Sequence, residues 1–313
     1  MGIPPEVPGI MRPTAPAPGA LWPAIVERAR HALSIGALLP VPTRVETLDD
    51  GGVCFLVRCV SDLARKPPAG ATGNPFAPYD PELFVADLAS THVALLNKFP
   101  VIEHHLLIVT RRFEPQDSAL TERDFAALAG CMAEFDGLGF YNAGTGAGAS
   151  QRHKHLQWVP LPLGPGTIEV PIEALLERAP PPAHPAAQPD RAASTRVERL
   201  PFEHSFVHLD PPLFADPDSA GERLAAHYRD LLRTAGIGLT ASDRGPMVAQ
   251  PYNLLVTRRW MLCVPRTQEC FDSISVNALG FAGSLLVQDQ DQLERVRRHG
   301  PLAVLRGVAH PRR

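Results

Sequence analysis

The sequence predicts a mixed α+β fold in which two related α/β halves face each other, and three observations support it. Short apolar runs typical of strands alternate with longer segments of helical spacing along most of the 313 residues. The runs at 106–113 (LLIVTRRF) and 253–261 (NLLVTRRWM) share one pattern, an apolar strand that ends in Thr-Arg-Arg and an aromatic residue. A stretch rich in proline and alanine at 166–200 separates them. Although two exposed strand ends can match by chance, we interpret the echo as an ancient duplication.

The N-terminal segments predict an arm, a helix, a strand and a loop. Residues 1–20 are rich in proline and predict a loose arm. Residues 22–38 have apolar side chains at helical spacing and predict an amphipathic helix. Residues 53–60 (VCFLVRCV) follow an Asp-Asp-Gly-Gly turn and predict a strand. Residues 64–82 carry too many prolines and glycines for regular structure, so we expect a loop there.

The remainder of the first half, up to residue 165, predicts strands on either side of a helix. Residues 83–113 are typical of two strands joined by a turn near Pro100. Thr121, with an aspartate three residues later, is close to a capping box and predicts a helix over 121–135. A glycine-rich loop follows, and residues 153–162 (HKHLQWVPLP) predict a strand.

We expect the segment 166–200 to be a linker and residues 201–313 to form the second half. Residues 215–237 predict a helix that stops at Gly236, and residues 252–266 predict a pair of strands. Residues 277–287 predict a short segment, and residues 290–308 a helix.

Composition and charge exclude several classes of function. Hydrophobic residues make up 45% of the chain and charged residues 20%, which suits a globular protein with a real core. The net charge of −3 gives no bulk positive field, so we expect neither a nucleic-acid partner nor an anionic membrane. The five cysteines form no CxxC pair, and the chain shows neither a signal peptide nor an apolar run long enough to span a membrane. We therefore expect a cytoplasmic protein.

The stretch from Gly144 to Pro160 (GTGAGASQRHKHLQWVP) places bare backbone directly before a cluster of nitrogen-bearing side chains. The alternation of a strand puts His153, His155 and Gln157 on one face. The glycine loop brings backbone N–H groups close enough to hold an anion. Because a neutral imidazole can attack phosphorus and hold it as a phosphoramidate, we interpret the stretch as an anion-binding loop followed by a nucleophile and donors.

The same residues allow two other interpretations. A His-x-His pair on a strand is a common pair of metal ligands, and Glu103, His104 or His105 would have to supply a third, because glutamine is a poor ligand. The two histidines of the pair can also be ordinary hydrogen-bonded polar residues. We expect His104 and His105, which precede a strand, to be structural or surface residues.

The motif HKHLQ resembles the His-x-His-x-Gln active-site motif of the transferase branch of the histidine-triad superfamily. Three blocks are similar to those of the diadenosine tetraphosphate phosphorylases, also called ATP adenylyltransferases, in the same order. They are ELFVADLASTHVALLNKFPVIEHHLLIVTRRFEPQDSALTERDF, FYNAGTGAGASQRHKHLQWVPLP and YNLLVTRRWMLCVPR. The resemblance covers residues 50–165 and, less closely, 245–270.

This resemblance implies a histidine-triad-like antiparallel sheet core with flanking helices and a fused second half, as in the galactose-1-phosphate uridylyltransferase-like branch. It implies reversible phosphorolysis of diadenosine tetraphosphate to ATP and ADP through a covalent adenylyl-histidine. His155 would be the nucleophile, and His153 would fix its orientation and tautomer. Gln157 would hold a non-bridging oxygen and would favour transfer to an acceptor rather than to water.

The resemblance also implies a set of nucleotide- and phosphate-binding residues. A magnesium or similar divalent ion is expected to arrive with the nucleotide, without a dedicated protein-bound metal site. Arg152 departs from the family motif and adds positive charge beside the loop. The implied binding residues are Lys66, Asn97, Lys98, Asn142, Gly148, Ala149, Ser150, Gln151, Asn253, Thr257 and Arg266.

Three competing functions remain at this point. A hexose-1-phosphate nucleotidylyltransferase shares the motif, but often has cysteine and histidine metal ligands that this chain does not show. A non-catalytic nucleotide-binding protein would not need the nucleophile. A metal-binding β-domain would use the histidines as ligands. The sequence leaves open the preferred dinucleotide and acceptor, the direction of flux and the oligomeric state. It also leaves open a relationship to enzymes that use adenylyl sulfate.

Overall fold

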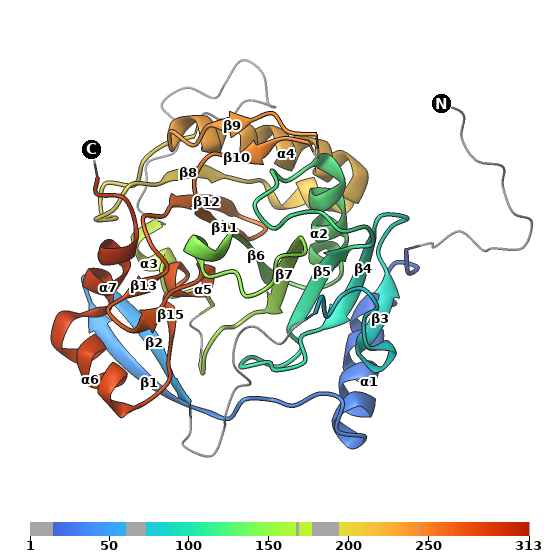
Figure 1. The fold of residues 1–313 in the computed structure, drawn as a ribbon, viewed down its shortest axis with the longest axis horizontal. Helices are drawn as coiled ribbons and strands as arrows, with labels where there is room; N and C mark the ends of the chain where they lie inside the picture. The colour runs from blue at the N-terminus through green and yellow to red at the C-terminus, as the bar shows by residue number, and fades with distance from the viewer. Residues whose placement is uncertain (1–14, 61–72, 167–168, 177–193, 244, 313) are drawn as a thin grey trace, which may run out of the picture.

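The computed structural model describes residues 15–60, 73–166, 169–176, 194–243 and 245–312, and its centre is one large sheet (Figure 1). This sheet has eight strands in the order β3-β4-β5-β7-β6-β11-β12-β8, and all neighbours are antiparallel. The predicted α+β class, with an antiparallel core sheet and flanking helices, is therefore confirmed. The strands are β3 Phe84–Asp87, β4 His92–Leu96, β5 Leu106–Thr110, β6 Gly137–Ala143, β7 His155–Pro160, β8 Ser205–His208, β11 Tyr252–Val256 and β12 Trp260–Pro265.

Three helices cover one face of the large sheet: α1 (Leu21–Ser34), α2 (Glu122–Glu134) and α4 (Pro217–Thr234). Their apolar stripes pack on sheet residues that include Ile108 and Trp158. The capping box at Thr121 is present, which confirms the predicted start of α2. The helix α4 ends where predicted, with Gly236 just beyond it at φ 71°, a conformation that glycine adopts without strain.

A second layer packs on part of the opposite face, and it combines the two ends of the chain. The strands β1 (Thr43–Asp50) and β2 (Val53–Val60) form a hairpin, and β15 (Ser284–Val287) pairs with β2 in parallel. The helices α6 (Gln290–His299) and α7 (Pro301–Val308) lie against this three-stranded sheet (Figure 1). The remaining elements are η1 Pro81–Leu83, η2 Thr145–Ala147, α3 Glu173–Leu176, η3 Pro211–Ala215, β9 Leu239–Thr240, β10 Met247–Val248, β13 Cys270–Phe271, β14 Ile274–Ser275 and α5 Ala278–Phe281.

Three expectations about single elements need correction. The segment before Pro100 holds two strands, β3 and β4, rather than one. The helix predicted over 290–308 is two helices, because Gly300 adopts φ 82° and a proline follows it. The short segment before them contains the strand β15, which is long enough to pair with β2.

The expected linker contains residues that pack into the core. Leu175 precedes the undescribed stretch 177–193, Val197 follows it, and both belong to the buried cluster beneath β2 and β15. The division into 1–20, 21–165, 166–200 and 201–313 stays a prediction, as does the duplication. Lys66 and residues 1–14 lie outside the described residues.

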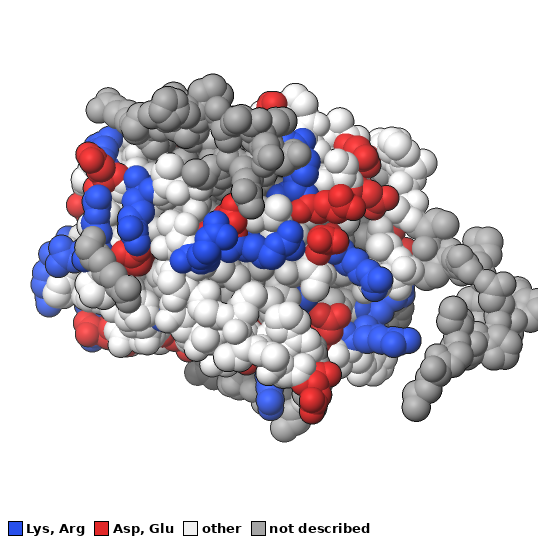
Figure 2. Space-filling model, turned by 90° about the horizontal axis from the view of Figure 1, so that it is seen from above, with Lys and Arg blue, Asp and Glu red and all other residues white. Residues whose placement is uncertain are grey.

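Charged side chains of both signs are interspersed on the face seen in Figure 2. This distribution agrees with the small net charge of the chain. Within the described part of the chain, no helix is long and apolar enough to cross a bilayer. All five cysteines are described, and all are free thiols.

Candidate active site

His155 is the first residue of β7 and lies on the sheet face opposite α2 and α4. Its side chain is buried, and its Nδ1 lies 2.8 Å from the carbonyl oxygen of His153. Burial lowers the pKa of His155 to about 4, against the opposing effect of this hydrogen bond. The imidazole is therefore neutral at pH 7, and the carbonyl fixes the proton on Nδ1. The lone pair consequently lies on Nε2, to which no described residue donates a hydrogen bond.

A second buried histidine, His204, resembles His155 in burial and tautomer but not in the hydrogen bonding of its Nε2. The Nδ1 of His204 lies 2.8 Å from the carbonyl of Phe202, and burial lowers its pKa to about 4 as well. Its Nε2, however, accepts a hydrogen bond of 2.8 Å from the backbone N–H of Val197. The lone pair of His204 is thus occupied, whereas that of His155 is available to a substrate.

His153 lies two residues before β7 and forms an isolated bridge with Pro115, so β7 begins two residues later than predicted. Its Nε2 lies 2.7 Å from the carbonyl oxygen of Thr110, and its Nδ1 lies 2.9 Å from the amide nitrogen of Asn74. The ring of Phe76 contacts both imidazoles, with centroids 5.7 Å from His153 and 5.3 Å from His155. The imidazole of His153 therefore does not bond that of His155, and the contact between them runs through the His153 carbonyl.

Gln116 holds the backbone of His155 on both sides. Its Oε1 accepts from the N–H of His155 at 2.8 Å, and its Nε2 donates to the carbonyls of His155 and Asn142 at 3.1 and 3.0 Å. The loop 111–119 thus fastens β7 to β6 at the position of the nucleophile. Sequence reasoning missed this residue, because a glutamine in a polar loop gives no local signal.

Gln157 lies on the same sheet face as His155, two residues further along β7. Its Oε1 lies 3.0 Å from Nε2 of His105, whose Nδ1 lies 3.2 Å from the amide nitrogen of Asn97. His105 is therefore a buried contact of the motif glutamine. The expectation that His105 is a surface or purely structural residue did not foresee this contact.

The glycine loop turns through η2, and two glycines make this turn possible. Gly144 and Gly148 adopt φ 81° and 85°, and a Cβ on Gly148 would lie 2.9 Å from the carbonyl oxygen of Val276. The N–H groups of Gly148 and Ala149 bond the carbonyls of Thr145 and Gly144 at 2.8 and 3.2 Å. A phosphate contact at these two N–H groups therefore has to replace bonds within the loop.

Asn142, Asn253 and Arg266 form a buried network behind the glycine loop. The amide nitrogen of Asn253 donates to Asn142 Oδ1 and to the Ala147 carbonyl, both at 2.8 Å. Arg266 donates to Asn253 Oδ1 and to backbone carbonyls, and burial lowers its pKa to about 10. Among the described residues no carboxylate lies within ion-pair distance of Arg266. Asn253 and Arg266, from the second half of the chain, thus hold the glycine loop of the first half together with Asn142.

The structure does not bring every predicted residue into this cluster. Thr257 lies in the turn between β11 and β12, four positions beyond Asn253, where its hydroxyl accepts the N–H groups of Arg259 and Trp260. The Lys98 ammonium lies 3.7 Å from a carboxylate oxygen of Asp80. The binding roles of these and the other predicted residues, which include exposed Ser150 and half-buried Gln151, stay predictions.

Comparisons with known proteins agree with this geometry. The family model described as the Ap4A phosphorylase N-terminal domain matches residues 11–178, and the one described as the ATP adenylyltransferase C-terminal domain matches residues 198–311. The chain belongs to the Ap4A phosphorylase family. It is a nucleotidyltransferase.

Yeast proteins are among the relatives of this chain. The chain is 30% identical over 269 residues to diadenosine 5',5'''-P1,P4-tetraphosphate phosphorylase 2 of Saccharomyces cerevisiae, which covers 77% of this chain and 78% of the relative. It is 26% identical over 310 residues to Protein APA1 of the same yeast, covering 89% and 90%. A crystal structure of the yeast Ap4A phosphorylase Apa2 in complex with Ap4A superposes with a TM-score of 0.74 at 26% identity, covering 93% of this chain and 98% of that one.

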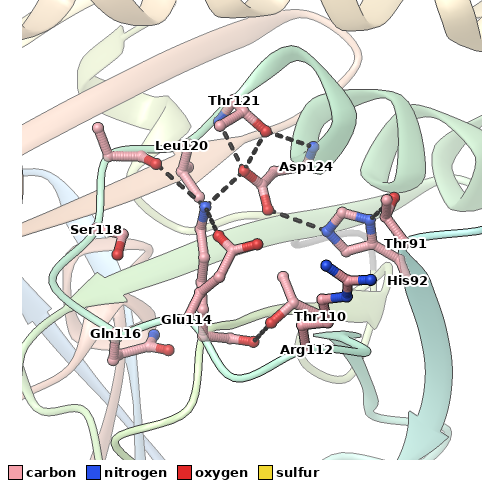
Figure 3. A network of polar contacts seen from close by, with 12 residues as sticks. Thr91, His92, Thr110, Arg112, Glu114, Gln116, Ser118, Leu120, Thr121 and Asp124 are labelled. Carbon is pink, nitrogen blue, oxygen red and sulfur yellow. Dashed lines mark hydrogen bonds and ion pairs between the residues drawn. The ribbon is translucent and has the colours of Figure 1, made fainter. Parts of the chain in front are cut away.

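A polar network surrounds Asp124 at the start of α2 (Figure 3). The buried ammonium of Lys154 contacts Asp124 at 2.7 Å, Glu114 at 3.1 Å and the carbonyl of Ala119 at 3.1 Å. The other oxygen of Asp124 lies 3.0 Å from Nε2 of His92. Burial acts to raise the pKa of Asp124, but the hydrogen bond from His92 and the charge of Lys154 outweigh it and hold this pKa well below its usual range.

The described residues contain no group of three or more histidines, cysteines, aspartates or glutamates arranged to hold a metal ion. The groups nearest His155 are imidazoles, amides and backbone carbonyls, which are not the carboxylate ligands that magnesium prefers. These residues do not fit a protein-held magnesium ion. A divalent ion that accompanies the nucleotide would have to be bound chiefly by the nucleotide itself.

Proposed function

We propose that the protein catalyses the phosphorolysis of diadenosine tetraphosphate (Ap4A) to ATP and ADP through an adenylyl group carried on His155. The observation that supports this most directly is the neutral, buried imidazole of His155, whose Nε2 carries a lone pair and faces no described hydrogen-bond donor. The names of the yeast relatives support the choice of substrate.

The first step forms a bond between Nε2 of His155 and the α-phosphorus of one adenylyl group. The bond from this phosphorus to the bridging oxygen breaks, and ATP leaves with the electron pair. The imidazole becomes positively charged in this step, because its proton stays on Nδ1. The carbonyl of His153, 2.8 Å from Nδ1, stabilises that charge.

In the second step an oxygen of inorganic phosphate attacks the same phosphorus. The P–N bond breaks, ADP is released, and His155 returns to its neutral form. Every bond in this sequence is made and broken at phosphorus, so the reaction is reversible by the same path. The Nε2 amide of Gln157 would donate to a non-bridging oxygen on which negative charge accumulates.

The polyphosphate is expected to lie along the glycine loop. Ser150 and Gln151 sit at the end of this loop, directly before the two histidines. Behind the loop, the buried cation of Arg266 forms no ion pair with a described carboxylate, although the charge of Glu269 acts on it, and its remaining field favours an anion there. The other residues that we propose for nucleotide binding are Lys66, Asn97, Lys98, Asn142, Gly148, Ala149 and Asn253. Thr257 lies in the turn after β11.

The deciding experiment incubates the protein with Ap4A, with and without inorganic phosphate, and identifies the products. We expect ATP and ADP only with phosphate, and loss of both in His155→Asn. His208→Asn, which changes an exposed histidine on the edge strand β8, is the control and should keep activity. ATP and AMP without phosphate would instead identify a hydrolase.

Two further results would redirect the proposal. Without turnover of Ap4A, exchange of a nucleoside diphosphate sugar with a sugar 1-phosphate would indicate the hexose-1-phosphate nucleotidylyltransferase. Binding of nucleotide without any turnover would indicate a nucleotide-binding protein. Labelling with ADP radioactive in its α-phosphate, which adenylylates His155 and releases phosphate in the reverse of the second step, should give an acid-labile, base-stable adduct in the native protein and none in His155→Asn.

A further inference from the structure

We propose that His105 is a positioning residue that fixes the amide of Gln157 with its nitrogen toward the substrate. This inference rests on the proposed function, because it assigns a role within that reaction. An amide side chain can present either its oxygen or its NH2 group to a ligand. Only the NH2 group stabilises the negative charge of a phosphoryl oxygen, so the orientation of Gln157 decides whether it assists or opposes the transfer.

A chain of hydrogen bonds beginning at the main chain sets this orientation. The N–H of Phe99 donates to Oδ1 of Asn97 at 3.2 Å, so the amide nitrogen of Asn97 must point the other way. That nitrogen lies 3.2 Å from Nδ1 of His105, and an amide NH2 can only donate. Nδ1 is therefore the acceptor, and the proton of the neutral imidazole lies on Nε2.

The next hydrogen bond, from His105 to the motif glutamine Gln157, runs in the same donor-to-acceptor direction. Nε2 of His105, carrying the proton, lies 3.0 Å from Gln157 and donates to its Oε1. The Nε2 amide of Gln157 then remains for the substrate, and no described residue accepts a hydrogen bond from it. The N–H of Asn97 also donates to the carbonyl of His105 at 2.8 Å, which fixes the spacing between the two residues.

The neighbouring residue holds His105 in place. The backbone of His104 adopts φ 57°, a value that residues other than glycine adopt infrequently. The ring of His104 lies 5.2 Å from that of Trp22. On the other side, the ring of Phe140 lies 5.8 Å from that of His105. The imidazole thus contacts side chains of β7, through Gln157, and of β6, through Phe140.

The first test reads the tautomer of His105 in the substrate-free protein by 15N NMR. We expect the proton on Nε2 and a hydrogen-bonded, unprotonated Nδ1, with the signal assigned by its loss in His105→Gln. A proton on Nδ1 instead would overturn the proposal. This measurement does not depend on turnover, so it decides the inference even when the phosphorylase assignment fails.

The second test is a double-mutant cycle on phosphorolysis. His105→Leu should lower kcat by about 10- to 100-fold, with KM for Ap4A changed little, because the amide of Gln157 is no longer held with its NH2 group toward the transition state. His105→Gln, whose amide can still donate to Gln157, should recover part of this loss. In a Gln157→Leu background, His105→Leu should cause no further loss of kcat.

Two outcomes of the cycle would overturn the proposal. One is the same fall in kcat from His105→Leu in both backgrounds, which would mean that His105 acts only on stability. The other is a native kcat in His105→Leu. His208→Asn serves as the matched loss of an imidazole outside the site. If His105→Leu does not fold, the comparison of His105→Gln with and without Gln157→Leu replaces it.

Discussion

His155 keeps its nucleophilic form because the sheet excludes water from it, not because a base lies beside it. Removal from water disfavours the charged imidazole, and a single carbonyl then selects the tautomer. His204 has the same two features, but its Nε2 accepts a hydrogen bond from a backbone N–H. The proposed nucleophile His155 therefore differs from the structural histidine His204 in one respect, which is that no described group donates a hydrogen bond to its Nε2.

The lowered pKa of His155 predicts a particular dependence of activity on pH. An ordinary histidine with a pKa near 6.5 loses its nucleophilic form in mild acid. With a pKa of about 4, His155 stays neutral, so kcat/KM for Ap4A at saturating phosphate should show no protonation of the free enzyme near pH 6.5. Initial rates between pH 5.5 and 8, corrected for the titration of the substrates, measure this. A fall in kcat/KM with an apparent pKa near 6.5 that remains after the correction would contradict it.

The same shift predicts how stability depends on pH. The unfolded chain binds protons at His155 and His204 near pH 6.5, and the folded protein binds them only near pH 4. Their contribution to the free energy of unfolding is therefore complete above pH 6.5 and is lost as the pH falls toward 4. Urea denaturation across this range should show the decline, and His155→Asn should make it less steep. An equal slope in that variant would contradict the prediction.

At the scale of elements, the start of β7 is fixed from two directions. Toward β6, Gln116 links the backbone of His155 to the carbonyl of Asn142. Toward the helices, Lys154, the residue before β7, contacts Asp124 at the start of α2, where Asp124 also accepts from the N–H of Thr121 at 2.6 Å (Figure 3). The strand that carries the nucleophile is therefore held by side chains from the loop and helix that precede it.

Loss of the lysine should leave a buried charge without its partner. Lys154→Met is expected to lower the free energy of unfolding by about 3–5 kcal/mol, because Asp124 remains ionised in the interior. In an Asp124→Asn background, where the amide can still accept from Thr121, the same change should cost clearly less. Urea denaturation of the four proteins measures the coupling, and equal costs in both backgrounds would show that the ion pair is not the cause.

Removal of Gln116 should affect both stability and rate. Gln116→Leu keeps the size of the side chain but leaves the N–H of His155 and two carbonyls without this partner. We expect a loss of about 1–3 kcal/mol for each of these buried groups that stays unpaired. The value of kcat should fall as well, because the strand end that positions Nε2 is released. Thermal unfolding and steady-state kinetics check this, and a variant with native kcat would show that the clamp is not needed for catalysis.

At the scale of the whole molecule, strands of the two halves pair with each other, both in the large sheet and in the smaller one. The strand β11 of the second half pairs with β6 of the first over five residue pairs, and β15 pairs with β2. Asn253 and Arg266 then reach from the second half to the glycine loop. The site is therefore complete only when both halves are present, even though all three motif residues lie in the first.

This arrangement predicts that the halves do not fold alone but do fold together. Residues 1–176 produced by themselves would expose the edge of β6 and the apolar residues that pack on β15, so we expect an insoluble fragment. Production together with residues 194–313 should give a soluble complex with phosphorolytic activity. Size-exclusion chromatography and the Ap4A assay check this. A soluble, active first fragment would show that the second half is dispensable.

The sequence by itself determined the features that depend on neighbouring residues. The capping box of α2 needs only Thr121 and Asp124, and the face shared by His155 and Gln157 follows from the alternation of a strand. The antiparallel fold followed from the resemblance of the motif blocks to a known family. Each of these signals lies within a short stretch of chain, where backbone geometry fixes which side chains meet.

Only the tertiary structure decided which distant groups complete the site. Gln116 acts across 39 residues and His105 across 52, and neither differs in type or local pattern from many other polar residues of the chain. Asn253 was implied by the family resemblance, but its contact with Asn142, across 111 residues, comes from the structure. Their contacts arise because β5, β6, β7 and β11 lie side by side in the large sheet. The hydrophobic pattern and the turns limit the register of neighbouring strands, but the order of strands that are distant in the sequence is set by the packing of the whole core.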